Sequence, residues 1–185
     1  MLEYINIKDT NLVSSRIALG TWAIGGWMWG GTDEKESVRT IHVALDHGIN
    51  LIDTAPIYGY GRSEQIVGEA LRQQGGREKV VLATKVGLDW TTGKIERNST
   101  RQRILQEFQD SLRRLQTDYI DIYQVHWPDP LVPSRKPPPL FSNSTNRARF
   151  VLSASAITRR SRWRVSKLPR RFTQFSRLII SSSAG

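Results

Sequence analysis

The sequence predicts an α/β fold built on a parallel sheet, either an open doubly wound sheet or part of a (β/α)8 barrel. Three observations predict this class of fold. Up to about residue 130, four strand-like runs alternate with three helical patterns. The strand-like runs are apolar along almost their whole length, as strands covered on both faces are. Polar residues gather at the ends of these runs, where active sites of both architectures collect.

Four short apolar runs account for the predicted strands. The first closes on a glycine, and all four are mostly apolar. In chain order they are SRIALG at Ser15–Gly20, INLIDT at Ile49–Thr54, KVVLATKVG at Lys79–Gly87 and YIDIYQVHW at Tyr119–Trp127.

Three helices are predicted between these strands. The first runs from Asp33 through Gly48, with Asp33 as the N-cap and Glu36 three residues on, as in a capping box. The second begins at Ser63 and the third at Ser99. Apolar residues recur at helical spacing in both, namely Ile66, Val67, Ala70 and Leu71 in the second and Ile104, Leu105, Phe108, Leu112 and Leu115 in the third.

The net charge of +10 is concentrated at one end of the chain. Residues 1–133 hold all 17 acidic residues and 15 Lys or Arg, whereas residues 134–185 hold 12 Lys or Arg and no acid. We therefore divide the chain into an ordinary, slightly acidic domain over 1–133 and a basic Ser/Arg-rich tail over 134–185, which we expect to be disordered. The tail has no stable basic helix and its aromatic residues are isolated, so we expect weak, salt-sensitive contacts and no specific nucleic-acid partner.

Composition also bounds the compartment. Cysteine is absent, which excludes disulfides and thiolate chemistry. The first residues do not resemble a secretory signal, and no run approaches the roughly 18 to 20 apolar residues that a membrane span needs. We expect a soluble cytoplasmic protein with no membrane association and no metal site.

Four polar side chains are predicted to meet at one rim of the sheet. Asp53, Lys85 and His126 lie near the ends of the second, third and fourth strands, and Tyr58 lies in the loop after the second. A lysine cation stabilises a neighbouring phenolate and so makes a tyrosine a better acid, an aspartate keeps that lysine charged, and a histidine can bind a substrate carbonyl or join a proton relay. Each residue alone has an ordinary structural role, as a loop cap, a strand-end cation or a core histidine. The four together favour catalysis.

The stretch GYGRSE at Gly59–Glu64 begins like a glycine-rich phosphate loop. The third glycine position is occupied by Glu64, and the stretch follows the second strand instead of the first. As a dinucleotide fingerprint it is weak, and its glycines are better interpreted as permitting a tight turn.

The chain resembles the aldo/keto reductase family over about residues 1–133. The motifs that carry the resemblance are GTW at Gly20–Trp22, DTAPIYGYGRSE at Asp53–Glu64, ATKVG at Ala83–Gly87 and SLRRLQTDYIDIYQVHWPDP at Ser111–Pro130. The resemblance implies a (β/α)8 barrel, of which this chain holds about the first four βα units. It also implies reduction of aldehydes or ketones with NADPH, or the reverse reaction on alcohols.

The resemblance also assigns roles to individual residues. Tyr58 corresponds to the proton donor, Lys85 makes it a stronger acid, Asp53 pairs with Lys85, and His126 helps to orient the carbonyl. Gly20, Thr21, Trp22 and Asp53 fall where the family contacts its cofactor. The substrate and the oligomeric state are not predicted, although Trp22, Trp27, Trp29 and Trp90 are open to interpretation either as a substrate wall or as ordinary packing.

The tail departs from the family pattern, because no strand–helix periodicity continues after residue 133. Three interpretations compete: a disordered extension, a nucleic-acid-binding tail, or translation in the wrong frame. The genetic code favours the third. Residues 147–164 can be written in codons that, read one base earlier, encode GKIRAIGVSNYSPEQMA, which resembles the family's fifth strand. We therefore hypothesise a one-base deletion or equivalent shift near codon 133 or 134.

Loss of the second half of the barrel has consequences for function. Half a barrel exposes strand edges and an apolar inner face, so we expect the 185-residue chain to be aggregation-prone and nearly inactive. An alternative function is a regulatory protein of the same fold, like the potassium-channel β-subunits that use this barrel as a cofactor sensor.

Overall fold

The computed structural model describes residues 2–8, 10–127, 129–131 and 147–150. Their centre is a five-stranded parallel sheet. Its strands, in spatial order, are β3 (Ala18–Gly20), β4 (Leu51–Asp53), β5 (Val81–Val86), β8 (Tyr119–Val125) and β9 (Arg147–Phe150).

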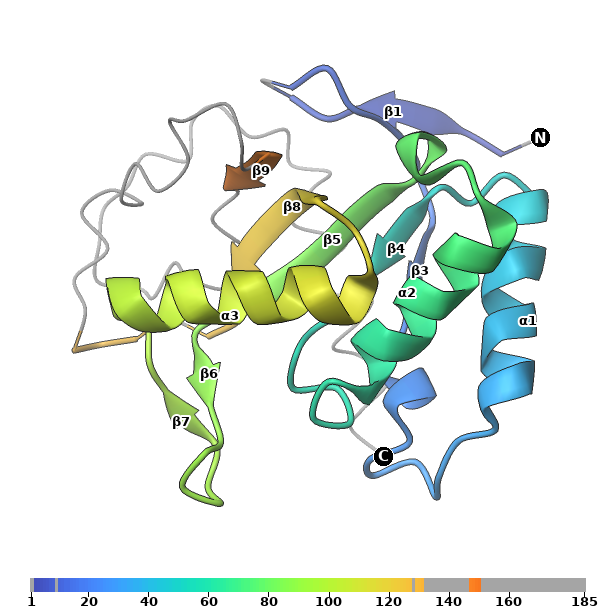
Figure 1. Cartoon of the computed structure of the whole chain (residues 1–185). Helices are drawn as coiled ribbons and strands as arrows, with labels where there is room; N and C mark the ends of the chain where they lie inside the picture. The colour runs from blue at the N-terminus through green and yellow to red at the C-terminus, as the bar shows by residue number, and fades with distance from the viewer. Residues whose placement is uncertain (1, 9, 128, 132–146, 151–185) are drawn as a thin grey trace, which may run out of the picture.

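The strand order distinguishes between the two predicted architectures. The spatial order of the strands follows the chain, without the reversal that defines a doubly wound sheet. Right-handed crossovers between sequential parallel strands put every helix on the same face. Figure 1 shows α1 (Glu34–Asp46), α2 (Arg62–Gln74) and α3 (Arg101–Leu115) side by side on one face of the sheet. The fold is therefore that of a (β/α)8 barrel wall, and the doubly wound alternative is wrong.

The main core lies between this sheet and its helices. Ile52, Leu82 and Val86 of the strands pack against the apolar stripes of the helices. Those stripes are the ones that the helical spacing predicts, including Ile66, Val67, Ala70 and Leu71 of α2 and Ile104, Phe108 and Leu115 of α3. The opposite face of β5 contributes Val81 and Ala83 to a smaller cluster with Ile7 and Ile122.

An antiparallel hairpin precedes the sheet and divides the first predicted strand. β1 (Tyr4–Asn6) pairs with β2 (Val13–Ser15), so that Ser15 ends the hairpin and β3 begins only at Ala18. The chain turns between them because Ser15 is held on both sides. Its amide donates to Asn50 Oδ1 at 2.6 Å and its hydroxyl donates to the Ile17 carbonyl at 2.7 Å. The strand predicted over Ser15–Gly20 is for this reason confined to Ala18–Gly20.

The helix caps confirm one prediction and correct two. The Asp33 carboxylate accepts from the Glu36 amide at 3.0 Å, so Asp33 is the N-cap of α1, which ends at Asp46 before the predicted Gly48. Helix α2 begins at Arg62, with Gly61 as its cap. Helix α3 begins at Arg101, and its cap is Thr100 instead of Ser99 because the Thr100 hydroxyl accepts from the Arg103 amide.

Two short helices and a second hairpin are also additional to the predicted elements. The helices are single turns of 3₁₀-helix, η1 (Ala23–Gly25) and η2 (Arg77–Lys79), and η2 removes Lys79 from the predicted third strand. The hairpin, formed by β6 (Leu88–Asp89) and β7 (Glu96–Arg97), leaves the carboxyl end of β5 before α3 begins (Figure 1).

Strand β9 is the one described element within the predicted tail. It pairs in parallel with β8, with Tyr119 opposite Arg147 and Tyr123 opposite Phe150. Arg147–Phe150 of that tail therefore lie along the β8 edge and pair with its main-chain hydrogen-bonding groups. The rest of the predicted tail lies outside the described residues. In the described part of the chain, no helix combines the length and apolar character needed to cross a bilayer.

Candidate active site

The predicted catalytic residues meet at the carboxyl rim of the sheet. Asp53 ends β4, Lys85 is the penultimate residue of β5, and His126 follows β8 directly. The His126 amide donates to the Val86 carbonyl at 2.8 Å, which continues the ladder between β5 and β8 past the end of the strand. Strand register thus brings residues from three strands to one edge.

Lys85 is the centre of the site. Its Nζ donates to both carboxylate oxygens of Asp53 at 2.9 Å, to the Thr54 carbonyl at 2.9 Å and to Tyr58 Oη at 3.2 Å. The Lys85 side chain is 12% exposed. Burial by itself opposes the charged form, but the charges of Asp53 and Tyr58 and their hydrogen bonds outweigh it, so the pKa of Lys85 is raised. Lys85 is therefore a cation at neutral pH.

Tyr58 is aimed at Lys85 by a tight loop between β4 and α2. The loop is held by the Tyr58 amide, which donates to Ala55 at 3.1 Å, and by the Ser63 amide, which donates to the Tyr58 carbonyl at 3.1 Å. Because the ammonium donates to Tyr58 Oη, the phenol's own proton is directed away from Lys85. The hydroxyl can therefore donate to a further acceptor, as a proton donor must.

The glycines of this loop allow it to touch η1. Gly59 has φ +61°, and a β-carbon there would overlap the Gly25 carbonyl. A β-carbon at Gly25 would in turn lie 2.7 Å from the Tyr58 carbonyl carbon. These two glycines permit a close backbone approach, which agrees with the interpretation of GYGRSE as a turn.

His126 closes the site on the far side of Tyr58. The two rings lie edge to face, with centroids 5.8 Å apart and planes at 86°. Burial, and then the nearby Lys85 cation, lower the pKa of His126 to about 3. The imidazole is therefore neutral at physiological pH and can take part in a hydrogen bond without adding a positive charge.

The structure separates the predicted cofactor contacts into two groups. Gly20 and Trp22 have accessible surface on the rim, and a β-carbon at Gly20 would meet nothing within 4 Å. Thr21 between them is fully buried: its hydroxyl donates to the Asp53 carbonyl at 3.1 Å and accepts from Ser63 Oγ at 2.8 Å. The Thr21 hydroxyl therefore links the end of β3 to the Asp53 main chain, between the two accessible residues.

A buried network behind the rim was not predicted from the sequence. The Ser63 hydroxyl bonds to Thr21 and Thr54, at the ends of β3 and β4. The Glu64 carboxylate, fully buried, accepts from Thr84 Oγ1 at 2.6 Å and from Arg114 Nε at 2.6 Å. Thr84 is the residue before Lys85, so this network ties α2 and α3 to the strand that carries the lysine. The signal that could have found Glu64 is its position beside the apolar stripe of α2.

Aromatic side chains border the site on the side of η1. Trp22 lies 6.2 Å from Tyr58 and 5.6 Å from Trp29, measured between ring centroids. A second row runs from Trp27 to Tyr60 at 5.2 Å and from Tyr60 to Trp90 at 6.0 Å. The four tryptophans therefore surround the loop of Tyr58, with Trp29 and Tyr60 about half exposed.

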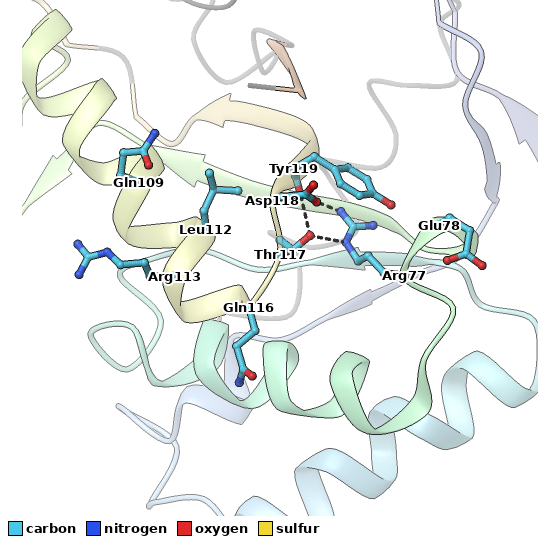
Figure 2. Close-up of a pocket in the computed structure, with 9 residues that line it drawn as sticks. All are labelled: Arg77, Glu78, Gln109, Leu112, Arg113, Gln116, Thr117, Asp118 and Tyr119. Carbon is cyan, nitrogen blue, oxygen red and sulfur yellow. Dashed lines mark hydrogen bonds between the residues drawn. The ribbon is translucent and has the colours of Figure 1, made fainter. Parts of the chain in front are cut away.

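A surface hollow of the described part of the chain lies elsewhere. Figure 2 shows it between the end of α3 and the start of β8, with a volume of about 730 Å³. Arg77 crosses it, donating to Thr117 Oγ1 at 3.2 Å and to the Tyr119 carbonyl at 3.0 Å. Since η2 precedes β5 and Tyr119 begins β8, the hollow is at the amino ends of the strands. It contains none of the predicted site residues, and no described cluster of three or more His, Asp or Glu side chains could hold a metal ion.

Comparison with known proteins agrees with this geometry. The model of the Aldo/keto reductase family matches residues 16–158, and so extends past residue 133, where we expect the resemblance to end. The chain is 63% identical over 132 residues to Aldo-keto reductase YhdN of Bacillus subtilis, covering 71% of this chain and 40% of that protein. It is 43% identical over 138 residues to the NADH-specific methylglyoxal reductase of Escherichia coli, covering 68% of this chain and 42% of that protein.

Solved structures give the same result. The glycerol dehydrogenase AKR11B4 from Gluconobacter oxydans superposes with a TM-score of 0.63 and 53% identity, over 70% of this chain and 41% of that one. The chain thus spans about two fifths of the length of the relatives it matches. With the barrel-wall fold and the Asp53–Lys85–Tyr58–His126 rim, these matches establish that the chain belongs to the aldo/keto reductase family.

Proposed function

We propose that this chain carries the catalytic half of an NADPH-dependent oxidoreductase that reduces small aldehydes or ketones to alcohols, or runs in reverse. The observation that supports this most directly is the placement of Lys85 Nζ within hydrogen-bonding distance of both Asp53 oxygens and of Tyr58 Oη. This arrangement holds a cation against a phenol that has a proton to give.

In the proposed mechanism Tyr58 donates its proton to the carbonyl oxygen of the substrate. The Lys85 cation stabilises the phenolate that remains, and Asp53 keeps Lys85 charged and fixed in direction. His126, neutral at pH 7, offers a hydrogen bond that orients the carbonyl. A reduced nicotinamide, when bound, supplies the hydride.

The rim fits a flat ring of this kind. Gly20 leaves open space at the end of β3, and the Trp22 indole borders it. We propose that Gly20, Trp22 and the partly exposed carboxylate of Asp53, at 21% exposure, face the nicotinamide. Thr21, between Gly20 and Trp22, is proposed as a further cofactor contact, and its hydroxyl also bonds to the Asp53 carbonyl.

The choice of NADPH over NADH rests on the family resemblance alone. The similar Escherichia coli reductase is named for NADH, so an assay must include both cofactors. We also propose that the activity requires the remainder of the barrel, because the chain spans about two fifths of the relatives it matches.

The test supplies that remainder. Residues 1–131 are fused to the part of YhdN that comes after its matched segment, giving a barrel with this chain's rim, called here the completed barrel. We expect it to oxidise NADPH with small aldehydes, measured by loss of reduced-nicotinamide absorbance. The Tyr58→Phe variant should lower kcat by a factor of about 10² to 10⁴, because it removes the acid.

Tyr60→Phe is the matched control, since Tyr60 lies in the same loop and is about half exposed. It should keep most of the activity. A completed barrel that folds and binds NADPH but turns over no carbonyl, or one whose turnover survives Tyr58→Phe, would contradict the proposal. Cofactor binding without turnover would support the alternative of a regulatory sensor.

A further inference from the structure

Two side chains of α3 hydrogen-bond to the main chain of the turn that follows β5. Glu107 Oε2 accepts from the Gly87 amide at 3.0 Å, and Arg103 Nη2 donates to the Leu88 carbonyl at 3.0 Å. The two partners are consecutive residues at the point where the strand ends. Side chains one helical turn apart on α3 thus bind both a main-chain N–H and a main-chain carbonyl at the end of β5.

We propose that Glu107 and Arg103 are positioning residues of the active site, which fix the β5 turn and, through it, Lys85 and Trp90. This inference rests on the proposed function only in that Lys85 is the group being positioned for catalysis. The hydrogen bonds from α3 to the turn can be tested without measuring activity.

The backbone of this turn is tightly constrained at Gly87. Gly87 has φ +95°, and a β-carbon there would lie 2.9 Å from Ser99 Oγ, so the backbone is confined to a conformation that favours glycine. Lys85 lies two residues before it, and the intervening Val86 carbonyl accepts from the His126 amide at 2.8 Å. A shift of this turn would therefore displace two of the four catalytic residues.

The same pair reaches the aromatic wall. The Arg103 guanidinium lies 5.5 Å from the centroid of the Trp90 ring, and its Nη1 lies 3.6 Å from Asp89 Oδ1. Trp90 packs in one cluster with Ala55, Ile57 and the Tyr58 side chain. A change in charge next to Arg103 therefore alters the electric field at the Trp90 ring. Trp90 lies at the edge of the loop that carries the proposed acid.

The charge of Glu107 changes near neutral pH. It is 2% exposed, and burial raises its pKa to about 7, against the opposing effects of the Gly87 hydrogen bond and of Arg103. The charged or titratable groups that face it are Arg103 at 3.5 Å and Arg114 from α3, Glu64 from α2 and Tyr123 from β8. Arg103 Nε, buried beside Glu107, has no hydrogen-bond partner within the described region. Ionisation of Glu107 would strengthen its ion pair with the Arg103 guanidinium, which lies against the Trp90 ring.

The first measurement is amide hydrogen exchange of the monomeric fraction of the full 185-residue chain, isolated by size exclusion, followed by mass spectrometry on peptides that contain Gly87. Glu107→Ala should speed exchange there about tenfold, the equivalent of one lost hydrogen bond. Glu107→Gln should not, because the amide oxygen still accepts from Gly87. Asp110→Asn is the matched control, an acid on the same helix that bonds to Gln106 and Arg113 and has no contact with the turn.

The second measurement distinguishes positioning by charge from a purely structural role. The emission of Trp90, taken as the difference from Trp90→Phe, should titrate between about pH 6 and 8 in the unmodified chain and in Asp110→Asn, following the charge of Glu107. The titration should disappear in Glu107→Gln. Unchanged exchange at Gly87 in Glu107→Ala, or the same titration in Glu107→Gln, would overturn the proposal.

The outcomes are independent of the proposed function. If the completed barrel proves inactive, the exchange and emission results still decide whether α3 holds the β5 turn. If it proves active, Glu107→Ala should lower kcat with little effect on KM, and Glu107→Gln should restore most of kcat, since it keeps the bond to Gly87.

Discussion

Lys85 shows how the fold makes a chemical group out of an ordinary side chain. A lysine at 12% exposure loses most of its hydration, which disfavours the ammonium. Two carboxylate oxygens, a carbonyl and a phenol replace that hydration, each within 3.2 Å. The raised pKa of Lys85 means that the pair with Asp53 stabilises the fold at neutral pH and is lost only as the pH rises past the range of an ordinary lysine.

The first prediction at this scale concerns Lys85→Met in the completed barrel. The variant should lower kcat by a factor of about 10² to 10⁴, because the phenolate left on Tyr58 loses its cation. It should also lower the thermal midpoint, because it leaves the Asp53 carboxylate partly buried without a partner. The exposed Lys94→Met is the control.

A double variant separates these two effects. Asp53→Asn combined with Lys85→Met removes both charges, and should recover part of the thermal stability while the activity stays lost. Recovery of both would mean that Lys85 has only a structural role.

The second prediction concerns His126. Since its pKa lies at about 3 in the folded state, its ring signals in an NMR titration should not move between pH 5 and 8. The unfolded chain takes up a proton near pH 6.5, so this residue makes the fold less stable as the pH falls from about 6.5 towards 3. His126→Gln should flatten that part of the stability profile. A His126 signal that titrates near pH 6.5 would contradict the assignment.

The positions of the candidate site residues were predictable where a motif carries them and not where a distant contact does. Asp53, Tyr58, Lys85 and His126 stand at strand ends or in the loop after one, and strand register alone brings them together. The bond of Thr21 to the Asp53 carbonyl, 32 residues away, was not predicted, because no local pattern reports it. The roles of Glu64 and Glu107 in the buried hydrogen-bond network were not predicted, because their partners come from other elements. Glu107 did carry a signal, as a charge between Ile104 and Phe108 on an apolar stripe.

At the scale of elements, the loop between β4 and α2 is held against η1 by backbone contact. No side chain separates Gly59 from Gly25, and the Tyr58 main chain lies directly against Gly25. The aim of the Tyr58 side chain therefore depends on the packing of two short segments that are 30 or more residues apart in the chain.

Gly59→Ala tests this packing. The substitution adds a β-carbon both at φ +61° and against the Gly25 carbonyl, so it should destabilise the completed barrel by about 2 kcal/mol or more and lower kcat. Gly93→Ala is the matched control, at φ +82° with nothing within 4 Å, and should cost about 1 kcal/mol from backbone strain alone. Equal losses of thermal midpoint in the two variants would show that the contact with η1 is unimportant.

Element type was predicted better than element bounds. All four strands and three helices exist in the predicted order, because apolar runs and helical spacing report burial directly. The division between β2 and β3 could not be predicted, since it depends on Ser15 bonding to Asn50, which is distant in sequence. The β6–β7 hairpin was not predicted for a different reason. Each of its strands has two residues, too few to show an alternating pattern.

At the scale of the molecule, the sheet is a wall of a barrel and not a closed one. Among the described strands, β3 has one neighbour, β4, and its other edge is unpaired. A closed barrel has no edge, and an unpaired parallel edge is a site for aggregation. The described sheet thus carries the residues of the proposed catalytic rim, but its described strands do not close around a space for a cofactor and substrate.

The last prediction concerns the reading frame beyond codon 133. Resequencing the gene across codons 125–140 and translating one base earlier should reveal a frame that continues through four more strand–helix units. The reason lies in residues 147–164, whose codons permit a segment resembling the family's fifth strand, and in the change in charge at the same point, where acidic residues cease. The product of the restored frame should be monodisperse and turn over carbonyls, whereas the 185-residue chain should aggregate and be nearly inactive. A stop codon soon after the shift would contradict the hypothesis. Tyr58 and its partners would then need strands from a second chain to complete the barrel.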